Sequence, residues 1–263
     1  MQLNTFEAFA MEQQFIRLNR ADTPFPCYYL ASKQLWLHFI PLDLYFTINP
    51  EKNLLHHVNI NIRSGNEKVI HIWEDIWKQH QQTIINRIHI QLGKGKKIFA
   101  RKCECTRVDK QAAHSFLLQH HLLRPTNAYY KLALQFEKEN IAVATFSKSR
   151  IMYDGPTYYR SYELERFATK SDCVITAGLS KIISCFVHQT SATHIMTYTD
   201  NDWGTGEGFK QAGFNPVEVI PHQLFYYDTS IQKRILLADA QTNVNPNLHK
   251  LYTSGSTKYV LHL

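Results

Sequence analysis

The stretch TAGLSKIISCFVHQTSATHIMTYT, residues 176–199, decides the fold class. Gly178 precedes apolar residues at helical spacing over Leu179–Gln189, and an apolar strand follows at His194–Thr199. A helix between two strands is typical of a sheet with helices packed on its faces. The stretch therefore predicts an α/β (α+β) fold, a mixed sheet flanked by helices.

The chain on either side continues this alternation. Two apolar runs joined by Glu137–Asn140 predict a β-hairpin. Asp109 predicts a helix start, because its carboxylate can accept hydrogen bonds from first-turn amides. We predict strands at 34–40, 54–62, 68–73, 98–107, 128–136, 141–147, 158–167, 194–199 and 224–228. We predict helices at 77–92, 109–118, 179–189 and 207–212, and a last strand at 259–263, at a sheet edge or against a partner.

The composition narrows the class of protein. Of the 263 residues, 44% are hydrophobic and 19% are charged, which allows a substantial core and excludes global disorder. The five cysteines have no framework spacing, which excludes a disulfide scaffold. No apolar run approaches the roughly 20 residues of a membrane helix, and the first residues lack a signal-peptide pattern. We therefore expect a cytoplasmic protein without a membrane partner, and the oligomeric state stays open.

The positive charge is concentrated in the first part of the chain. The 29 Lys and Arg residues exceed the 22 Asp and Glu residues, and the net charge of +7 favours anionic partners. Residues 1–110 hold 15 basic and 10 acidic residues, against 14 and 12 in the remainder. The densest patch consists of Lys94, Lys96, Lys97, Arg101 and Lys102. It predicts either a solvated strand edge or phosphate contacts with nucleic acid.

The glycine turn before the predicted helix 179–189 is a candidate anion site. Glycine lets the backbone approach a phosphate closely, and exposed amides together with the helix dipole attract the anion. The residues of this turn are Thr176, Ala177, Gly178, Leu179, Ser180 and Lys181. Ser180 would add a hydroxyl contact and Lys181 a charge. The alternative is an ordinary turn between a strand and a helix.

This turn and the stretch EGFKQAGF, residues 207–214, resemble motifs of the GNAT acyltransferase superfamily. In that superfamily the turn binds the pyrophosphate of an acyl-coenzyme A, two strands part for its pantetheine arm, and a strand glutamate is the usual base. The resemblance implies an N-acyltransferase with acetyl-CoA or another acyl-CoA as cofactor and a small-molecule or peptide amine as acceptor. It implies Glu163 or Glu165 as the base. The alternative for both is a solvent-facing or salt-bridged row.

Two positions depart from the superfamily pattern. Ile175 stands where the turn usually carries Arg or Gln, and Phe209 stands where the late helix usually carries a tyrosine that acts as general acid.

The loop after the predicted strand 194–199 is the candidate acceptor pocket. The resemblance places this loop where the GNAT sheet opens, so Asp200 and Trp203 would line the pocket. Tyr159, from the predicted strand 158–167 that holds both glutamates, would line it too. Asp200 also fits a turn-forming role in the sequence Asp-Asn-Asp, and Tyr159 also fits core packing.

A closer resemblance covers roughly residues 30–235. The stretches 163–167, 178–181, 197–200 and 213–214 resemble a GNAT-like domain of phage and mobile-element proteins, which often follows a nuclease domain of the very-short-patch-repair type. This implies a degenerate nuclease-like α/β domain at 1–105, a GNAT-like domain at 106–235 and a tail at 236–263. The nuclease's strand glutamate falls near His38, and only Asp43, Glu74 and Asp75 remain as acids, so we expect that cleavage is lost. The alternative function is a non-catalytic nucleic-acid-binding protein derived from a mobile-element endonuclease.

Overall fold

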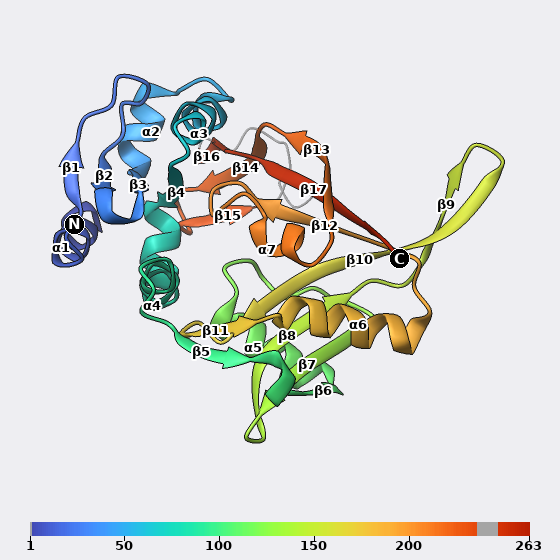
Figure 1. Ribbon diagram of the computed structural model, residues 1–263. Coiled ribbons are helices and arrows are strands. Elements are labelled where there is room, and N and C mark those ends of the chain that lie inside the picture. Colours follow the sequence, from blue (N-terminus) through green and yellow to red (C-terminus); the bar gives the residue numbers. More distant parts are fainter. Residues whose placement is uncertain (1, 236–246) are drawn as a thin grey trace. The chain divides into compact units, whose positions relative to one another are not determined.

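The computed structural model describes residues 2–235 and 247–263 (Figure 1). Contacts divide the chain into two compact units, each assembled from separated segments. The first unit takes its residues from 1–79, 199–205 and 219–257, and the second from 80–198, 206–218 and 258–263. The boundaries predicted at 105 and 235 are continuous in sequence and divide the chain differently, so they stay a prediction. Part of the predicted tail, 236–246, lies outside the described residues.

Two small sheets form the first unit. The four-stranded sheet has the order β1-β2-β3-β4, in which only β3 and β4 are parallel. The three-stranded sheet is antiparallel, with the order β15-β14-β16. The elements are α1 (Gln2–Glu12), β1 (Ile16–Leu18), β2 (Cys27–Leu30), η1 (Ala31–Lys33), β3 (Leu35–Ile40), α2 (Leu42–Ile48), α3 (Leu54–Ser64), β4 (Lys68–Trp73), β14 (Gln223–Asp228), β15 (Lys233–Ile235) and β16 (Leu248–Thr253).

Helices cover both faces of the four-stranded sheet. Strand β3 is buried at all six positions, as expected of a strand that is covered on both sides. Phe6 of α1 stacks on Phe39 at 4.7 Å between ring centroids. On the other face Val58 and Ile62 of α3 pack with Trp36. The apolar run Leu35–Ile40 therefore forms the centre of this unit's core.

The predicted strand at 54–62 is wrong, because these residues form helix α3. Its buried side chains are Leu55, Val58, Asn59 and Ile62. They recur at the i, i+3, i+4, i+7 spacing of a helix face. The polar Asn59 inside this stripe obscures the helical period in the sequence.

The second unit is built on a mixed sheet of eight strands. Its order is β13-β17-β12-β10-β8-β7-β6, and β9 pairs with β10 beyond this path. The elements are α4 (Glu74–Gln91), β5 (Lys96–Phe99), η2 (Ala100–Lys102), β6 (Glu104–Arg107), α5 (Lys110–His120), β7 (Tyr130–Phe136), β8 (Glu139–Phe146), β9 (Arg150–Asp154), β10 (Thr157–Thr169), β11 (Cys173–Thr176), α6 (Gly178–Thr190), β12 (His194–Asp200), α7 (Glu207–Gln211), β13 (Asn215–Ile220) and β17 (Ser256–His262). The prediction of a mixed sheet flanked by helices is confirmed.

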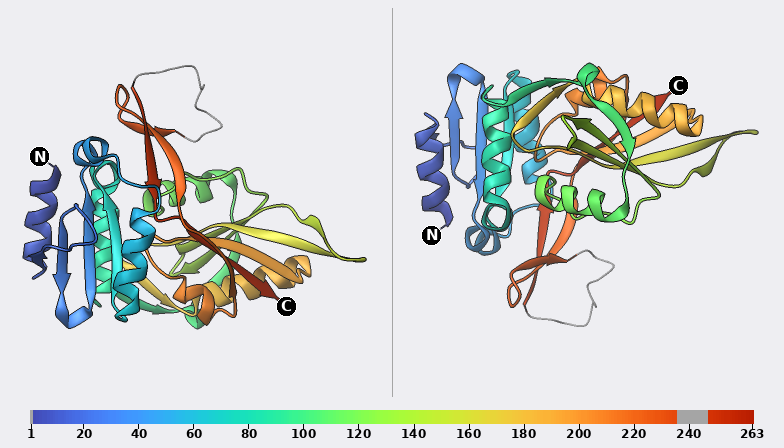
Figure 2. Two further views of the ribbon diagram at one scale, coloured as in Figure 1. Left: turned by 90° about the horizontal axis from the view of Figure 1, so that it is seen from above. Right: turned by 90° about the horizontal axis from the view of Figure 1, so that it is seen from below.

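Helices α6 and α5 pack on opposite faces of this sheet (Figures 1 and 2). On the α6 face, Phe186 stacks on Phe146 of β8 with ring centroids 3.8 Å apart. On the α5 face, Phe116 packs with Val143 of β8 and Ala168 of β10. Alternate residues of β8 therefore point to different helices, as the two-residue period of a strand requires.

Two predicted strands differ in detail. The stretch 98–107 is interrupted by the short helix η2, so β5 pairs with β11 in a separate two-stranded sheet while β6 joins the edge of the main sheet. The last strand, β17, lies between β12 and β13 inside the main sheet rather than at an edge.

Within the described ranges, no helix has the length and apolar character needed to cross a bilayer.

Candidate functional site

Strands β10 and β12 form a parallel pair that separates part-way along. The ladder joins Ser161, Tyr162 and Glu163 to His194, Ile195 and Met196, although both strands continue beyond it. Where the ladder stops, the Thr197 hydroxyl donates to the Leu164 carbonyl oxygen at 2.9 Å. The backbone ladder therefore ends after Glu163, and this side-chain hydrogen bond links the strands at the next position.

A β-bulge occurs at the same level of β10. The register between β10 and β8 shifts between Leu164 and Arg166, so Glu165 is the extra residue. Before the bulge Leu164 packs in the core under α6, and after it Phe167 does so. The core-facing residues change from even to odd positions, so the bulge shifts the alternation of side chains along β10 by one residue.

The two candidate glutamates are placed differently. Glu163 alternates with buried Tyr162 and Leu164, and its amide donates to the Ser147 hydroxyl at 3.0 Å. Glu165 lines a cavity of about 510 Å³, which we call the Glu165 cavity. The other lining residues are Asn127, Ala128, Tyr129, Lys131, Ser147, Lys148, Ser149 and Arg150. Only Glu165 can meet a small molecule bound there.

The Glu165 cavity is rich in positive charge. Lys148 Nζ lies 4.9 Å from the centre of the Tyr129 ring, and Lys131 Nζ donates to the Ala128 carbonyl oxygen at 2.6 Å. Beside the cavity, burial lowers the pKa of the Arg166 guanidinium, while the nearby Glu165 and Glu163 carboxylates act in the opposite direction. The cavity residues come from three separate stretches, so no local sequence motif signals the cavity.

The start of α6 offers unpaired amides. Ala177 precedes the helix in the left-handed conformation (φ 60°), and no side chain among the described residues caps the helix. Thr176 and Ala177 are exposed. An added Cβ at Gly178 would approach Ile175 Cγ2 to 2.8 Å, so this glycine is required for packing. The uncapped first turn suits an anion.

Lys181 is held by main-chain groups. Its ammonium donates to the Ala100 carbonyl oxygen at 2.9 Å and also to the Cys103 carbonyl oxygen. These bonds join α6 to η2. The charge of Lys181 stays near the helix start, but two of its three N–H groups are already used.

The basic patch lies beside this turn. Strands β5 and β11 pair in parallel, and the register places Phe99 next to Thr176. The cations Lys96, Lys97, Arg101 and Lys102 are exposed, and the Arg101 guanidinium lies 5.2 Å from the centre of the Phe99 ring. We call Lys96–Lys102 together with Thr176–Lys181 the β5–α6 surface. The sequence treats these stretches as two unrelated sites, about 80 residues apart; the β5–β11 pairing brings them together.

The three predicted pocket residues have other surroundings. Tyr159 packs against His194 at 4.7 Å between ring centroids, near the start of the β10–β12 pair. Asp200 Oδ1 accepts from the Asp202 amide at 2.9 Å, and the Trp203 amide donates to the Asp200 carbonyl oxygen at 3.1 Å. Asp200 therefore forms a turn, which was its alternative role. Asp200 and Trp203 belong to the first unit and Tyr159 to the second.

The acids of the predicted nuclease-like region have structural contacts. Glu74 accepts from the Leu42 amide at 2.8 Å, and Asp75 forms a buried ion pair with Arg234 at 2.7 Å. Asp43 is exposed. In residues 2–235 and 247–263, no three His, Cys, Asp or Glu side chains form a group able to hold a metal ion.

A buried histidine pair is a feature that the sequence analysis missed. His38 and His71 lie side by side on β3 and β4, with their Nδ1 atoms 2.7 Å apart. Burial lowers the pKa of both, that of His71 to about 3, so both are neutral at pH 7. Thr23 bonds to His38 at 2.9 Å and Asn59 to His71 at 2.9 Å. Asn59 Oδ1 can only accept, so His71 donates to it from Nε2. A neutral imidazole has one N–H, so His71 Nδ1 carries no proton and accepts a hydrogen bond from His38 Nδ1.

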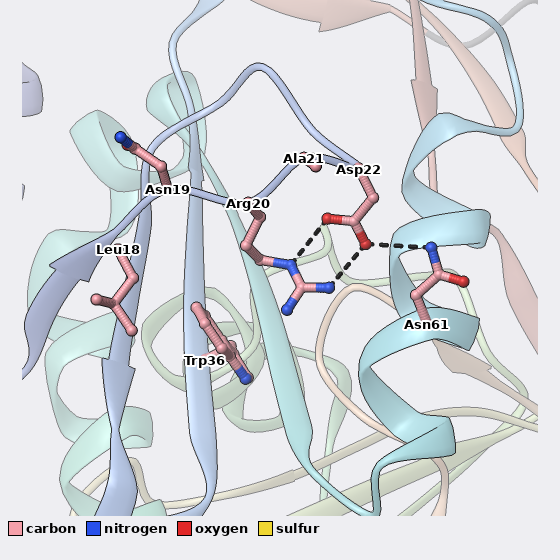
Figure 3. Close-up of a pocket in the computed structure, with 7 residues that line it drawn as sticks. All are labelled: Leu18, Asn19, Arg20, Ala21, Asp22, Trp36 and Asn61. Carbon is pink, nitrogen blue, oxygen red and sulfur yellow. Dashed lines mark hydrogen bonds and ion pairs between the residues drawn. The ribbon is translucent and has the colours of Figure 1, made fainter.

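A second cavity, of about 470 Å³, lies in the first unit (Figure 3). There Arg20 donates two hydrogen bonds to Asp22, at 2.9 and 2.7 Å, and Asn61 donates a third at 3.1 Å. The Arg20 guanidinium lies 4.8 Å from the centre of the Trp36 ring. Its charge is neutralised by Asp22, so this cavity offers no free cation or carboxylate to a ligand.

Comparisons with known proteins give similarities in structure alone. No family model and no curated protein matches the chain. A GNAT family acetyltransferase from Elizabethkingia anophelis with acetyl-CoA bound is 9% identical, with 62% of this chain and 99% of that chain covered and a TM-score of 0.35. The Bacillus subtilis acetyltransferase in complex with CoA is 10% identical, with 62% and 99% covered and a TM-score of 0.35. A putative GNAT acetyltransferase from Desulfovibrio desulfuricans is 12% identical, with 61% and 98% covered and a TM-score of 0.37. Similarity at this level establishes neither a family nor an activity.

Proposed function

We propose that this chain is an acyl-coenzyme A-dependent N-acyltransferase whose acceptor is a small-molecule or peptide amine. The observation that carries the proposal is the opening between β10 and β12, whose parallel ladder stops at Glu163 just before the bulge at Glu165. Where paired strands part, their amides and carbonyls become available to an extended ligand that carries its own amides.

The β5–α6 surface supports binding of the cofactor's phosphates. The uncapped amides of the first α6 turn favour a pyrophosphate. The exposed Lys97 on β5 and Arg101 on η2 add positive charge, and β5 pairs with β11, the strand that ends at Thr176. We infer that the α6 turn contacts the pyrophosphate and that the lysines and arginine of β5 and η2 contact further phosphate oxygens.

The Glu165 cavity supports a role in proton transfer. When bound, the cofactor supplies a thioester, whose acyl carbon forms a bond to the acceptor nitrogen while the carbon–sulfur bond breaks. Glu165 would take the proton that the amine loses, because its carboxylate lines the cavity in which the acceptor would bind. Phe209 packs against Phe214 and Tyr259 and has no proton to give, so water would protonate the leaving thiolate.

The binding part of the proposal is tested with acetyl-CoA and the full chain in a calorimeter. We expect binding that weakens several-fold in Lys97→Ala/Arg101→Ala. The matched control, Lys110→Ala/Lys138→Ala, removes two charges from other parts of the same unit and should bind like the unaltered protein. No binding by the unaltered protein at millimolar acetyl-CoA would contradict the proposal.

The catalytic part is tested with Glu165→Gln. We expect kcat for acetyl transfer to a panel of amines to fall about 10²–10⁴-fold, the usual contribution of a general base. Acetyl-CoA affinity should not change, because Glu165 lies in the cavity and outside the β5–α6 surface. Glu163→Gln is the matched control and should retain most activity. Equal decreases of kcat in Glu165→Gln and Glu163→Gln would contradict the role of Glu165 as the general base.

The same cations carry a second candidate function, nucleic-acid binding. The exposed Phe99 ring beneath Arg101 combines an aromatic surface with positive charge, a pattern that suits nucleic acid. Salt-sensitive binding of DNA or RNA that Lys96→Glu/Lys97→Glu abolishes, in a protein that fails to bind acetyl-CoA, would favour this candidate over acyl transfer.

A further inference from the structure

Strand β9 and the first part of β10 form a two-stranded ribbon at the end of the main sheet, which projects from the rest of the second unit in all three views (Figures 1 and 2). The antiparallel pairs run from Ser161↔Arg150 to Thr157↔Asp154. The connection is the two-residue turn Gly155-Pro156, and Gly155 has φ 58°, which only glycine adopts readily. The ribbon is therefore a defined element with a tight turn.

One face of the ribbon exposes two tyrosines. Tyr153 and Tyr158 are directly paired, so their side chains lie on the same face, with 76% and 68% of their surface exposed. The next pair on the same face is Ile151 and Arg160, two positions along the ladder, and Ile151 is 58% exposed. Large apolar and aromatic groups gathered on such a projection indicate an interaction surface.

The charge of the ribbon favours an anionic partner. Between Lys148 and Ser161 the chain has three basic residues and one acidic residue. Arg150 and Arg160 are exposed on the two strands, and neither forms an ion pair within the described residues.

The ribbon is continuous with the Glu165 cavity. Arg150 and Lys148 line that cavity, and Arg150 is also the first residue of β9. The cavity adds a third exposed tyrosine, Tyr129. Exposed tyrosine rings and cations therefore occur at both places: Tyr129, Lys148 and Arg150 at the cavity, and Tyr153, Tyr158 and Arg160 on one face of the ribbon, with Arg150 on the opposite face at the base of β9.

We propose that the ribbon and the rim of the Glu165 cavity together bind single-stranded nucleic acid. Unpaired bases would stack on Tyr153 and Tyr158, and Arg160 on the same face would contact phosphates. Lys148 and Arg150 would contact phosphates where the strand passes the base of the ribbon. Aromatic platforms interleaved with cations are what a single strand needs, since every base offers a face for stacking while a duplex keeps its bases stacked inside. A second copy of the chain fits less well, because it would bring the same cations against one another. This site lies outside the β5–α6 surface and does not depend on acyl transfer.

The test measures fluorescence anisotropy of fluorescein-labelled (dT)20 with the full chain at 50–200 mM KCl. We expect binding that weakens at least about tenfold in Tyr153→Ala/Tyr158→Ala, since stacking contributes about 1–3 kcal/mol per base and about 1.4 kcal/mol is tenfold. Tyr153→Phe/Tyr158→Phe keeps both rings and should retain binding. In Arg150→Gln/Arg160→Gln, the slope of log affinity against log salt should fall by about 1.4, or about 0.7 per phosphate contact.

The matched control is Lys110→Gln/Lys138→Gln, which removes two exposed charges outside both the ribbon and the β5–α6 surface and should leave the affinity nearly unchanged. Four results would overturn the proposal. Three of them are that the unaltered protein does not bind (dT)20 at 50 mM KCl, that Lys96→Gln/Lys97→Gln loses binding while both ribbon variants retain it, and that an unlabelled duplex competes as well as a single strand. A change of mass in light scattering for Tyr153→Ala/Tyr158→Ala, with (dT)20 binding intact, would assign the ribbon to a contact between copies and equally overturn it.

Discussion

The two units differ in where their charged and polar side chains lie and in whether those side chains have partners. In the first unit polar groups are buried and paired, as in the His38–His71 contact and the Asp75–Arg234 ion pair. In the second unit Lys97 and Arg150 are exposed, and neither forms an ion pair in the part of the chain that the structure describes, whereas Lys170 and Lys210 pair with Glu139 and Glu207 at the surface. Buried polar groups require partners to offset lost hydration, whereas exposed cations have water and can exchange it for a ligand. The comparison therefore indicates structural roles for the buried pairs and leaves Lys97 and Arg150 available to a ligand.

The largest expected effect comes from breaking the buried ion pair. Arg234→Met leaves the Asp75 carboxylate, with a side chain only 1% exposed, without its partner. It also removes the guanidinium 4.7 Å from the Trp73 ring centre. We expect a loss of about 3–5 kcal/mol in the free energy of unfolding, measured by urea denaturation.

The matched control is the exposed pair Lys170–Glu139, at 2.6 Å. Lys170→Ala should cost less than about 1 kcal/mol. The double variant Arg234→Met/Asp75→Leu should recover much of the loss, because it removes the uncompensated charge. Equal losses for Arg234→Met and Lys170→Ala would contradict the distinction between buried and exposed pairs.

The histidine pair predicts a loss of stability in acid. The folded-state pKa of His71, about 3, is below the unfolded value of 6.5, so the unfolded chain binds more protons between these values. Stability is therefore full above about pH 6.5 and falls as the pH falls toward 3. His71 alone should cost about 2 kcal/mol by pH 5. The unfolding free energy should decline less between pH 6.5 and pH 5 in His71→Gln than in the unaltered protein. If the two proteins have the same pH profile, His71 is not buried in its neutral form.

The smallest expected effect on stability is at the exposed cations. Lys97→Ala/Arg101→Ala should change the unfolding free energy by no more than about 0.5 kcal/mol, because both side chains are exposed. The same variant should lose acetyl-CoA affinity. A large loss of stability would show that these cations are structural and would remove the contrast between the units.

Local patterns predicted much of the second unit. Asp109 caps α5 by accepting from the Ala112 amide at 2.7 Å, and the apolar runs around Glu137–Asn140 form the hairpin β7–β8. Such features depend on neighbours along the chain, and the composition of the stretch is enough to predict them. Helix α3 failed this test because Asn59, a polar residue, occupies one of its buried positions.

The candidate site was predicted in parts. The glycine turn and the two glutamates were identified as candidates, but their pattern could not distinguish Glu165 from Glu163. The difference arises from a bulge in the β10–β8 register, which depends on a strand some 20 residues away. The exposure of Tyr153 and Tyr158 was not predicted, since a sequence does not show that β9 and β10 extend beyond the rest of the sheet.

The alternation of strands and helices, the excess of positive charge and the glycine turn at Gly178 can be predicted from the sequence, because they follow from local periodicity and composition. Three features appear only in the folded chain: Lys96–Lys102 lies beside that turn, Glu165 lines a cavity, and Tyr153 and Tyr158 are exposed. Each of these depends on which strands pair and in which register. A shift of one residue would turn every side chain to the opposite face.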